Sequence, residues 1–188
     1  VFTEDKSVSA KEVFDFLASI GGEQYSRDVL LRVAESYGAQ TEWERSNEAY
    51  RFLIKMDPDS IKSAEYQRDI VGNWNAALDV DKTQEEIKVL LERYGPGGPW
   101  AKAQKNRDAM LRSLQITEEL TRSSATTIHG EAQRREKGLK LVRPGEGCAD
   151  RAYLPKDLEQ FYQRAADAYE TYLTAFGGAL IELLEVLR

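Results

Sequence analysis

Cysteine and histidine, on which much protein chemistry depends, are almost absent from this sequence. Among 188 residues there is one cysteine, Cys148, and one histidine, His129. A single cysteine excludes an internal disulfide and a zinc cage built from cysteines. Few residues are therefore available for a metal site or for nucleophilic catalysis.

The sequence also lacks long apolar runs and an excess of positive charge. No stretch of about 18 apolar residues occurs, so we predict no membrane span. The formal net charge is −6, whereas a general nucleic-acid binder needs a basic face that displaces counterions. The chain begins at Val1 without a signal or lipid-anchor motif, and we expect it to be processed or cut from a longer protein.

Helical signals, in contrast, run through the whole chain. Capping boxes predict helix starts at Ser9, Thr41 and Thr83, because a Ser or Thr oxygen and a Glu carboxylate three residues later satisfy free amides. Residues 57–60 are predicted to form a turn that caps a further helix. The apolar positions of that helix are Ile61, Ala64, Ile70, Val71, Trp74 and Leu78. No segment alternates with a period of two, so the predicted fold class is all-α.

The C-terminal half combines long helices with one irregular segment. From Trp100 the helical pattern continues without proline and predicts one helix to about Glu136. Residues 137–154 are rich in glycine and proline and are predicted to be a functional insertion or a mobile loop. Pro155 then opens another helix. Residues 179–188 are too apolar for a free terminal helix, so we expect another repeat or another chain to cover them.

Residues 27–60 contain the most specific pattern in the sequence. Two helical segments place apolar, small or aromatic residues at Leu30, Val33, Ala34, Tyr37, Ser46, Tyr50, Leu53 and Pro58. This spacing resembles the tetratricopeptide repeat (TPR), a helix pair of about 34 residues. The small residues Ala34 and Ser46 would let two antiparallel helices approach closely. Leu30 stands where the repeat usually has Trp, and Val33 and Ser46 replace the more common Leu and Ala.

The resemblance is good over residues 27–60, fair over residues 158–178 and poor elsewhere. In the second range Ala165 and Tyr169 repeat the small-x3-aromatic spacing, and Gly177 and Gly178 stand where the repeat has its closing proline. The resemblance implies a single TPR-like domain over residues 1–188, with antiparallel helix pairs in a right-handed superhelix, one long helix and one long loop. The chain is similar to divergent TPR proteins of the bacterial cell envelope, which organise assembly, secretion or motility. That similarity alone implies a periplasmic or envelope location.

TPR arrays bind partners along a concave groove that is formed by the first helix of each pair. The resemblance implies that Asp28, Leu31, Arg32 and Glu35 face this groove. Chaperone-binding TPRs clamp a terminal carboxylate with Lys and Asn at the positions held here by Leu31 and Glu35, so we do not expect that function. An acidic, partly apolar groove instead suits a basic or mixed peptide, or a neighbouring folded protein.

A second candidate surface is the one local basic cluster. Arg134 and Arg135 are followed closely by Lys137, Lys140 and Arg143. An anionic partner could dock there. A basic helix end that complements the dipole of its own helix is the simpler explanation.

No motif supplies a complete catalytic or metal site. His129 and Glu131 form the His-x-Glu of zinc deaminases, but the accompanying Pro-Cys-x-x-Cys is missing. Cys148 and His129 could pair as nucleophile and base, although nothing around Cys148 offers a helix start that would lower the pKa of the thiol. Acidic clusters at 57–59, 79–81, 85–86 and 118–119 lack the features of a calcium loop and are better explained by helix capping and solvated faces.

We therefore predict a non-catalytic scaffold, without cofactor or metal, that binds a protein or peptide partner. Two alternatives stay open. The first is a ligand-binding or enzymatic helical domain with its site near His129 and residues 137–153. The second is an adaptor that self-associates through residues 179–188.

Overall fold

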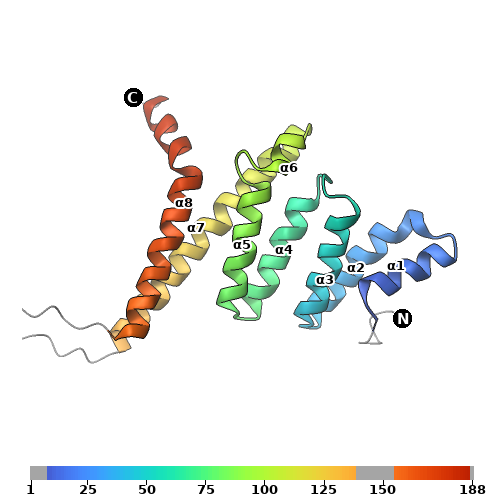
Figure 1. The fold of residues 1–188 in the computed structure, drawn as a ribbon, viewed down its shortest axis with the longest axis horizontal. Coiled ribbons are helices and arrows are strands. Elements are labelled where there is room, and N and C mark those ends of the chain that lie inside the picture. The colour runs from blue at the N-terminus through green and yellow to red at the C-terminus, as the bar shows by residue number, and fades with distance from the viewer. Residues whose placement is uncertain (1–7, 139–154, 187–188) are drawn as a thin grey trace, which may run out of the picture. The chain divides into compact units, whose positions relative to one another are not determined.

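The computed structural model describes residues 8–138 and 155–186, with side chains described as far as residue 178. Every regular element in these ranges is a helix, which confirms the all-α prediction. The elements are α1 (Ala10–Ser19), the 3-10 turn η1 (Glu23–Tyr25), α2 (Ser26–Ala39), α3 (Trp43–Met56), α4 (Ser63–Ala76), α5 (Val80–Tyr94), α6 (Pro99–Ala103), α7 (Arg107–Gly138) and α8 (Lys156–Val186) (Figure 1).

Contacts divide the chain into two compact units, residues 1–117 and 118–188, and the boundary falls inside α7. We call them the first and the second unit. The single domain inferred from the sequence stays a prediction. Among the described residues, no helix is both long and apolar enough to cross a membrane.

In the first unit, α2, α3, α4 and α5 pack in chain order, each against the next, and short turns reverse the chain between them (Figure 1). The apolar faces of α1, α2, α3 and α4 meet in a core that contains the helical residues of the TPR-like pattern, Leu30, Val33, Ala34, Tyr37, Tyr50 and Leu53. Ser46 is fully buried, and its Oγ donates a hydrogen bond to the carbonyl of Ala34 at 2.8 Å. The two small residues therefore do bring α2 and α3 close together.

The helix pair repeats along the chain. α2 and α4 both have 14 residues, and α4 begins 37 residues after α2. α5 likewise begins 37 residues after α3. In this register Trp74 takes the place of Tyr37 and Leu90 that of Leu53, and all four are buried. The observed spacing is three residues longer than the 34-residue TPR period.

Two of the three predicted capping boxes are wrong. Ser9 caps α1 as predicted, with its Oγ accepting from the N–H of Glu12 at 3.2 Å. Thr41 instead ends α2 with φ of 61°, and its N–H donates to the carbonyl of Gly38 at 3.0 Å. Thr83 lies within α5, which begins at Val80 and is capped by Asp79. α3 begins after Glu42, whose side chain makes no capping hydrogen bond, so a nearby side-chain cap sets the start of α5 but not that of α3.

The helix α4 also differs from its prediction at both ends. It begins at Ser63 after Lys62, which makes no side-chain cap, so residues 57–60 do not cap it. Leu78 was expected on its apolar face, but it follows the helix with φ of 60° and is 85% exposed. The N–H groups of Leu78 and Asp79 donate back to the carbonyls of Asn75 and Trp74, both at 3.1 Å. The chain thus leaves the helix before the apolar stripe is complete.

The prediction of one helix from Trp100 to about Glu136 is wrong at its start. Trp100 belongs to the short helix α6, the chain is non-helical at residues 104–106, and α7 begins at Arg107. Asn106 Oδ1 accepts from the N–H of Ala109 at 2.9 Å and so caps α7. Trp100 is buried, and its Nε1 donates to the carbonyl of Ser60 at 2.9 Å. This distant contact holds Trp100 in a separate helix.

In the second unit the long helices α7 and α8 carry the buried residues Ala125, Ile128, Ala132, Leu158, Ala165 and Phe176. α8 continues through Gly177 and Gly178, so these glycines do not end it. Residues 139–154, which include Cys148 and most of the predicted insertion, lie outside the described residues, as do the side chains of residues 179–188.

Candidate functional site: a groove between α2 and α4

An open groove of about 440 Å³ lies in the first unit between α2 and α4. This volume is within the usual range for ligand sites. One wall comes from α2, the other from α4, and buried side chains of α3 lie between them. The lining residues are Glu35, Gly38 and Ala39 of α2, Trp43, Ser46 and Tyr50 of α3, and Asp69, Gly72 and Asn73 of α4.

Two glycines leave room for the groove. A Cβ placed at Gly72 would have no neighbour within 4 Å. A Cβ at Gly38 would lie 3.3 Å from Ser46 Oγ and 3.6 Å from Asn73 Oδ1. Because neither helix carries a side chain at these positions, the space between α2 and α4 stays open.

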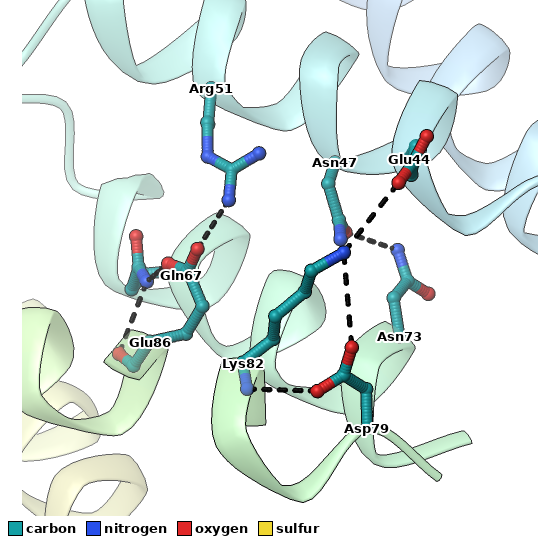
Figure 2. Close-up of polar contacts among 8 residues, drawn as sticks. All are labelled: Glu44, Asn47, Arg51, Gln67, Asn73, Asp79, Lys82 and Glu86. Atoms are coloured by element: carbon teal, nitrogen blue, oxygen red, sulfur yellow. Dashed lines mark hydrogen bonds and ion pairs between the residues drawn. The ribbon is translucent and has the colours of Figure 1, made fainter. Parts of the chain in front are cut away.

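A hydrogen-bond relay fixes the base of the groove. Asn73 Nδ2 donates to Asn47 Oδ1 at 2.7 Å (Figure 2). It also donates to Ser46 Oγ at 2.8 Å, and Ser46 Oγ donates onward to the carbonyl of Ala34. The two donated bonds identify the amide nitrogen of Asn73, so its Oδ1 is the atom that faces Gly38. The relay joins α4, α3 and α2 and holds an acceptor at the groove.

The charged side chains of the lining are both acidic. Glu35 is exposed and forms no ion pair with any described residue. Asp69 is half-buried, and the Arg68 guanidinium contacts its Oδ1, with Nη2 at 2.7 Å and Nε at 2.8 Å. No described donor reaches Asp69 Oδ2. Burial raises the pKa of Asp69, Arg68 opposes that shift, and the charges of Glu65 and Glu35 add to it.

Tyr50 lies in the electrostatic field of the same two carboxylates. It is 6% exposed and stacks on Tyr66 with ring centroids 5.9 Å apart. The pKa of Tyr50 is raised to about 12, chiefly by burial; the charges of Asp69 and then Glu35 add to this shift, and Arg68 opposes it. Trp43 is half-buried at the other end of the lining on α3 and packs against the core. The groove is therefore acidic and partly aromatic.

Polar contacts beside the groove hold α3, α4 and α5 together (Figure 2). Buried Gln67 donates from Nε2 to Glu86 Oε2 at 2.7 Å, and Arg51 pairs with Oε1 of the same carboxylate. Lys82 lies 3.6 Å from a Glu44 oxygen and 3.8 Å from an Asp79 oxygen. Its ammonium also sits 4.0 Å from the ring centroid of Trp74. These contacts fix the helices whose side chains line the groove.

Of the four groove residues expected from the sequence, Glu35 lines the groove. Asp28, Leu31 and Arg32 do not; Leu31 is half-buried against the core, whereas Asp28 and Arg32 are exposed. Sequence reasoning missed the contribution of α4 altogether. The spacing of 37 residues between helix pairs was the signal that could have aligned α4 with α2.

Two arginines of the predicted basic cluster share one carboxylate in the second unit. Arg134 Nη2 lies 2.7 Å from one oxygen of Glu131, and Arg135 Nε lies 3.0 Å from the other. Hydrogen bonds from Arg135 and Arg134 lower the pKa of the Glu131 carboxyl. The Arg135 guanidinium also stacks 3.7 Å from the ring centroid of Phe161. The structure thus gives both arginines intramolecular roles.

His129 belongs to a packed aromatic group between α7 and α8. Its Nδ1 lies 3.3 Å from Tyr169 Oη and its Nε2 lies 3.2 Å from Gln133 Nε2. Its ring meets those of Tyr162 and Tyr169 edge to face. Within the described part of the chain, no three His, Cys, Asp or Glu side chains are grouped to hold a metal ion. Cys148 lies outside the described residues.

No family model, no curated protein and no solved structure matches this chain.

Proposed function

We propose that the first unit is a non-catalytic binding module that holds an extended segment of a partner protein in the groove between α2 and α4. The observation that carries the proposal is the groove itself, about 440 Å³ in volume and open to solvent between two helices that α3 holds apart. Gly38 and Gly72 expose helix backbone along its walls. A partner backbone can therefore approach more closely here than at a helix face covered by side chains.

The repeated helix pair supports a TPR-like arrangement. α2 and α4 are the first helices of successive pairs, 37 residues apart, and both line the groove. First helices of successive pairs also form the binding surface of a TPR array. The proposed scaffold is a divergent member of that architecture, with helix pairs in a right-handed superhelix. Its place in the bacterial cell envelope is supported only by the sequence resemblance.

A blocking substitution tests the proposal directly. The full chain would carry a photoreactive residue in place of Ala39, which is exposed and lines the groove. It would be irradiated in an extract of the native source, with and without Gly72→Leu. Leucine at position 72 places a side chain in the groove, and it favours the helix over glycine. We expect Gly72→Leu to reduce capture of the partner at least tenfold.

Gly130→Leu is the matched control. Gly130 is also a helical glycine with open space around it, but it lies on α7 in the second unit. We expect this variant to capture the partner as the parent chain does. Equal capture by the Gly72→Leu chain, with unchanged helical circular dichroism, would reject groove binding. Capture only from a chain with the photoreactive residue at Arg135 would move the binding site to the second unit.

A further inference from the structure

We infer that the groove receives an arginine side chain of the partner, with its guanidinium between the carboxylates of Glu35 on α2 and Asp69 on α4. This inference rests on the proposed function and names the chemistry of the segment that the groove binds. The source of the arginine is an extended peptide segment of another protein.

The groove offers a set of hydrogen-bonding atoms that are all acceptors. The Glu35 carboxylate, Asp69 Oδ2 and Asn73 Oδ1 are all acceptors, and among the described residues none of them receives a hydrogen bond. They come from both walls of the groove. A group that satisfies them together must present several donors and no acceptor. Guanidinium has five N–H donors in one plane and no acceptor, which matches this set.

The charge of the groove also favours a cation. The two charged side chains of the lining, Glu35 and Asp69, are both acidic, and no basic side chain lines the groove. Arg68 stands beside it on α4 but contacts only Oδ1 of Asp69. Burial already disfavours the charged form of Asp69, which is why its pKa is raised. A cation bound at Oδ2 would offset that cost, because opposite charge favours the ionised carboxylate.

Aromatic side chains form part of the groove surface. Tyr50 and Trp43 belong to the same lining as the two carboxylates. A guanidinium stacks on aromatic rings while its edge donates hydrogen bonds, and it is less strongly hydrated than an ammonium. The groove therefore favours arginine over lysine.

Three small probes distinguish the effect of charge from the effect of guanidinium shape. N-acetyl-arginine amide, N-acetyl-lysine amide and N-acetyl-citrulline amide would each be titrated into the full chain. The amide signals of Gly38 and Gly72 and the indole signal of Trp43 would be followed by nuclear magnetic resonance. We expect the arginine probe to shift these signals in a saturable way and the lysine probe to bind more weakly. Citrulline keeps the shape of arginine but has no charge, and we expect no binding.

Variants of the acidic groups identify the contacts. Glu35→Gln and Asp69→Asn are each expected to weaken the arginine probe about tenfold, in the range for one hydrogen bond to a charged group. Glu48→Gln is the control, because it removes one negative charge from an exposed position of α3 outside the groove lining. Equal binding of citrulline, or equal weakening by Glu48→Gln, would overturn the inference. Equal affinity for the lysine probe would also overturn it.

The two proposals can fail separately. If Gly72→Leu abolishes partner capture while Glu35→Gln and Asp69→Asn change neither capture nor probe binding, the groove binds a partner without arginine. If the arginine probe binds as expected but Gly72→Leu leaves capture unchanged, the cation site stands and the proposed partner groove is wrong.

Discussion

Three residues in the first unit end helices with positive φ, and only one of them is glycine. Gly21 has φ of 74°, Thr41 of 61° and Leu78 of 60°. In each case the N–H of the positive-φ residue and the N–H of the residue after it donate to backbone carbonyls near the end of the helix. A left-handed conformation costs a residue with a Cβ about 1–2 kcal/mol. Thr41 and Leu78 therefore hold strain that glycine would remove.

Leu78→Gly is expected to raise the free energy of unfolding of the first unit by about 0.5–1 kcal/mol. The gain is the released strain, less the larger unfolded-state entropy of glycine. Leu78 is 85% exposed, so its side chain contributes little packing. Urea unfolding measures the change. Leu78→Ala keeps the Cβ and is expected to stay within about 0.5 kcal/mol of the parent; an equal gain in both variants would contradict the strain explanation.

Tyr50 makes the stability of the first unit depend on alkaline pH. Its pKa is raised from 10.0 to about 12, chiefly by burial, so the folded state favours the protonated phenol. The stabilisation is complete below pH 10 and is lost as pH rises towards 12, because the unfolded chain releases the proton first. We expect Tyr50→Phe to reduce this loss by an amount on the order of 1 kcal/mol, as measured by urea unfolding at several pH values.

Exposed Tyr25 provides the control for this measurement. We expect the loss of unfolding free energy above pH 10 to be smaller in Tyr50→Phe than in Tyr25→Phe. A curve for Tyr50→Phe that overlays the parent curve above pH 10 would show that Tyr50 is not the titrating group.

At the scale of the elements, α3, α4 and α5 are joined through one half-buried carboxylate. Glu86 on α5 accepts from Gln67 on α4 and pairs with Arg51 on α3. Its side chain is 14% exposed, so a lost hydrogen bond would not be replaced fully by water. This junction stabilises the helices that form the groove.

Gln67→Leu is expected to lower the unfolding free energy of the first unit by about 1–3 kcal/mol, because it leaves an acceptor of half-buried Glu86 without its donor. Gln40→Leu is the matched control. Gln40 is exposed and donates to Ser36 Oγ at 3.1 Å, so water can replace that bond. Urea unfolding measures both variants. If they lose similar amounts of unfolding free energy, the Gln67 hydrogen bond contributes no more to stability than the exposed Gln40 bond.

At the scale of the whole molecule, the two units provide separate signals. Trp43, Trp74 and Trp100 all belong to the first unit, whereas helical circular dichroism reports on both units. Two probes give the same midpoint only when the chain unfolds in a single two-state transition. We expect the two units to unfold separately, so tryptophan fluorescence and circular dichroism should give different unfolding midpoints.

Ile128→Ala tests the assignment of these signals. Ile128 is 5% exposed in the second unit, and its truncation is expected to cost about 2–5 kcal/mol there. The circular dichroism curve should broaden towards lower denaturant while the fluorescence midpoint stays unchanged. If the fluorescence midpoint also moved to lower denaturant, α7 would couple the units into one cooperative transition.

The sequence by itself determined the helical class and the first helix pair, because both depend on residues three or four positions apart. Apolar and small residues at that spacing specify a helix face wherever the helix packs. Leu30, Ala34, Tyr37 and Leu53 were predicted on this basis and are buried.

Only the tertiary structure decided where several helices end and what the groove contains. Trp100 is held in its own short helix by a hydrogen bond to Ser60, 40 residues earlier, which no local pattern could indicate. Glu35 and Asp69 share a groove because α3 packs between α2 and α4 and sets their distance. The groove and its charge are therefore properties of packing between distant segments, which the period of a single helix does not encode.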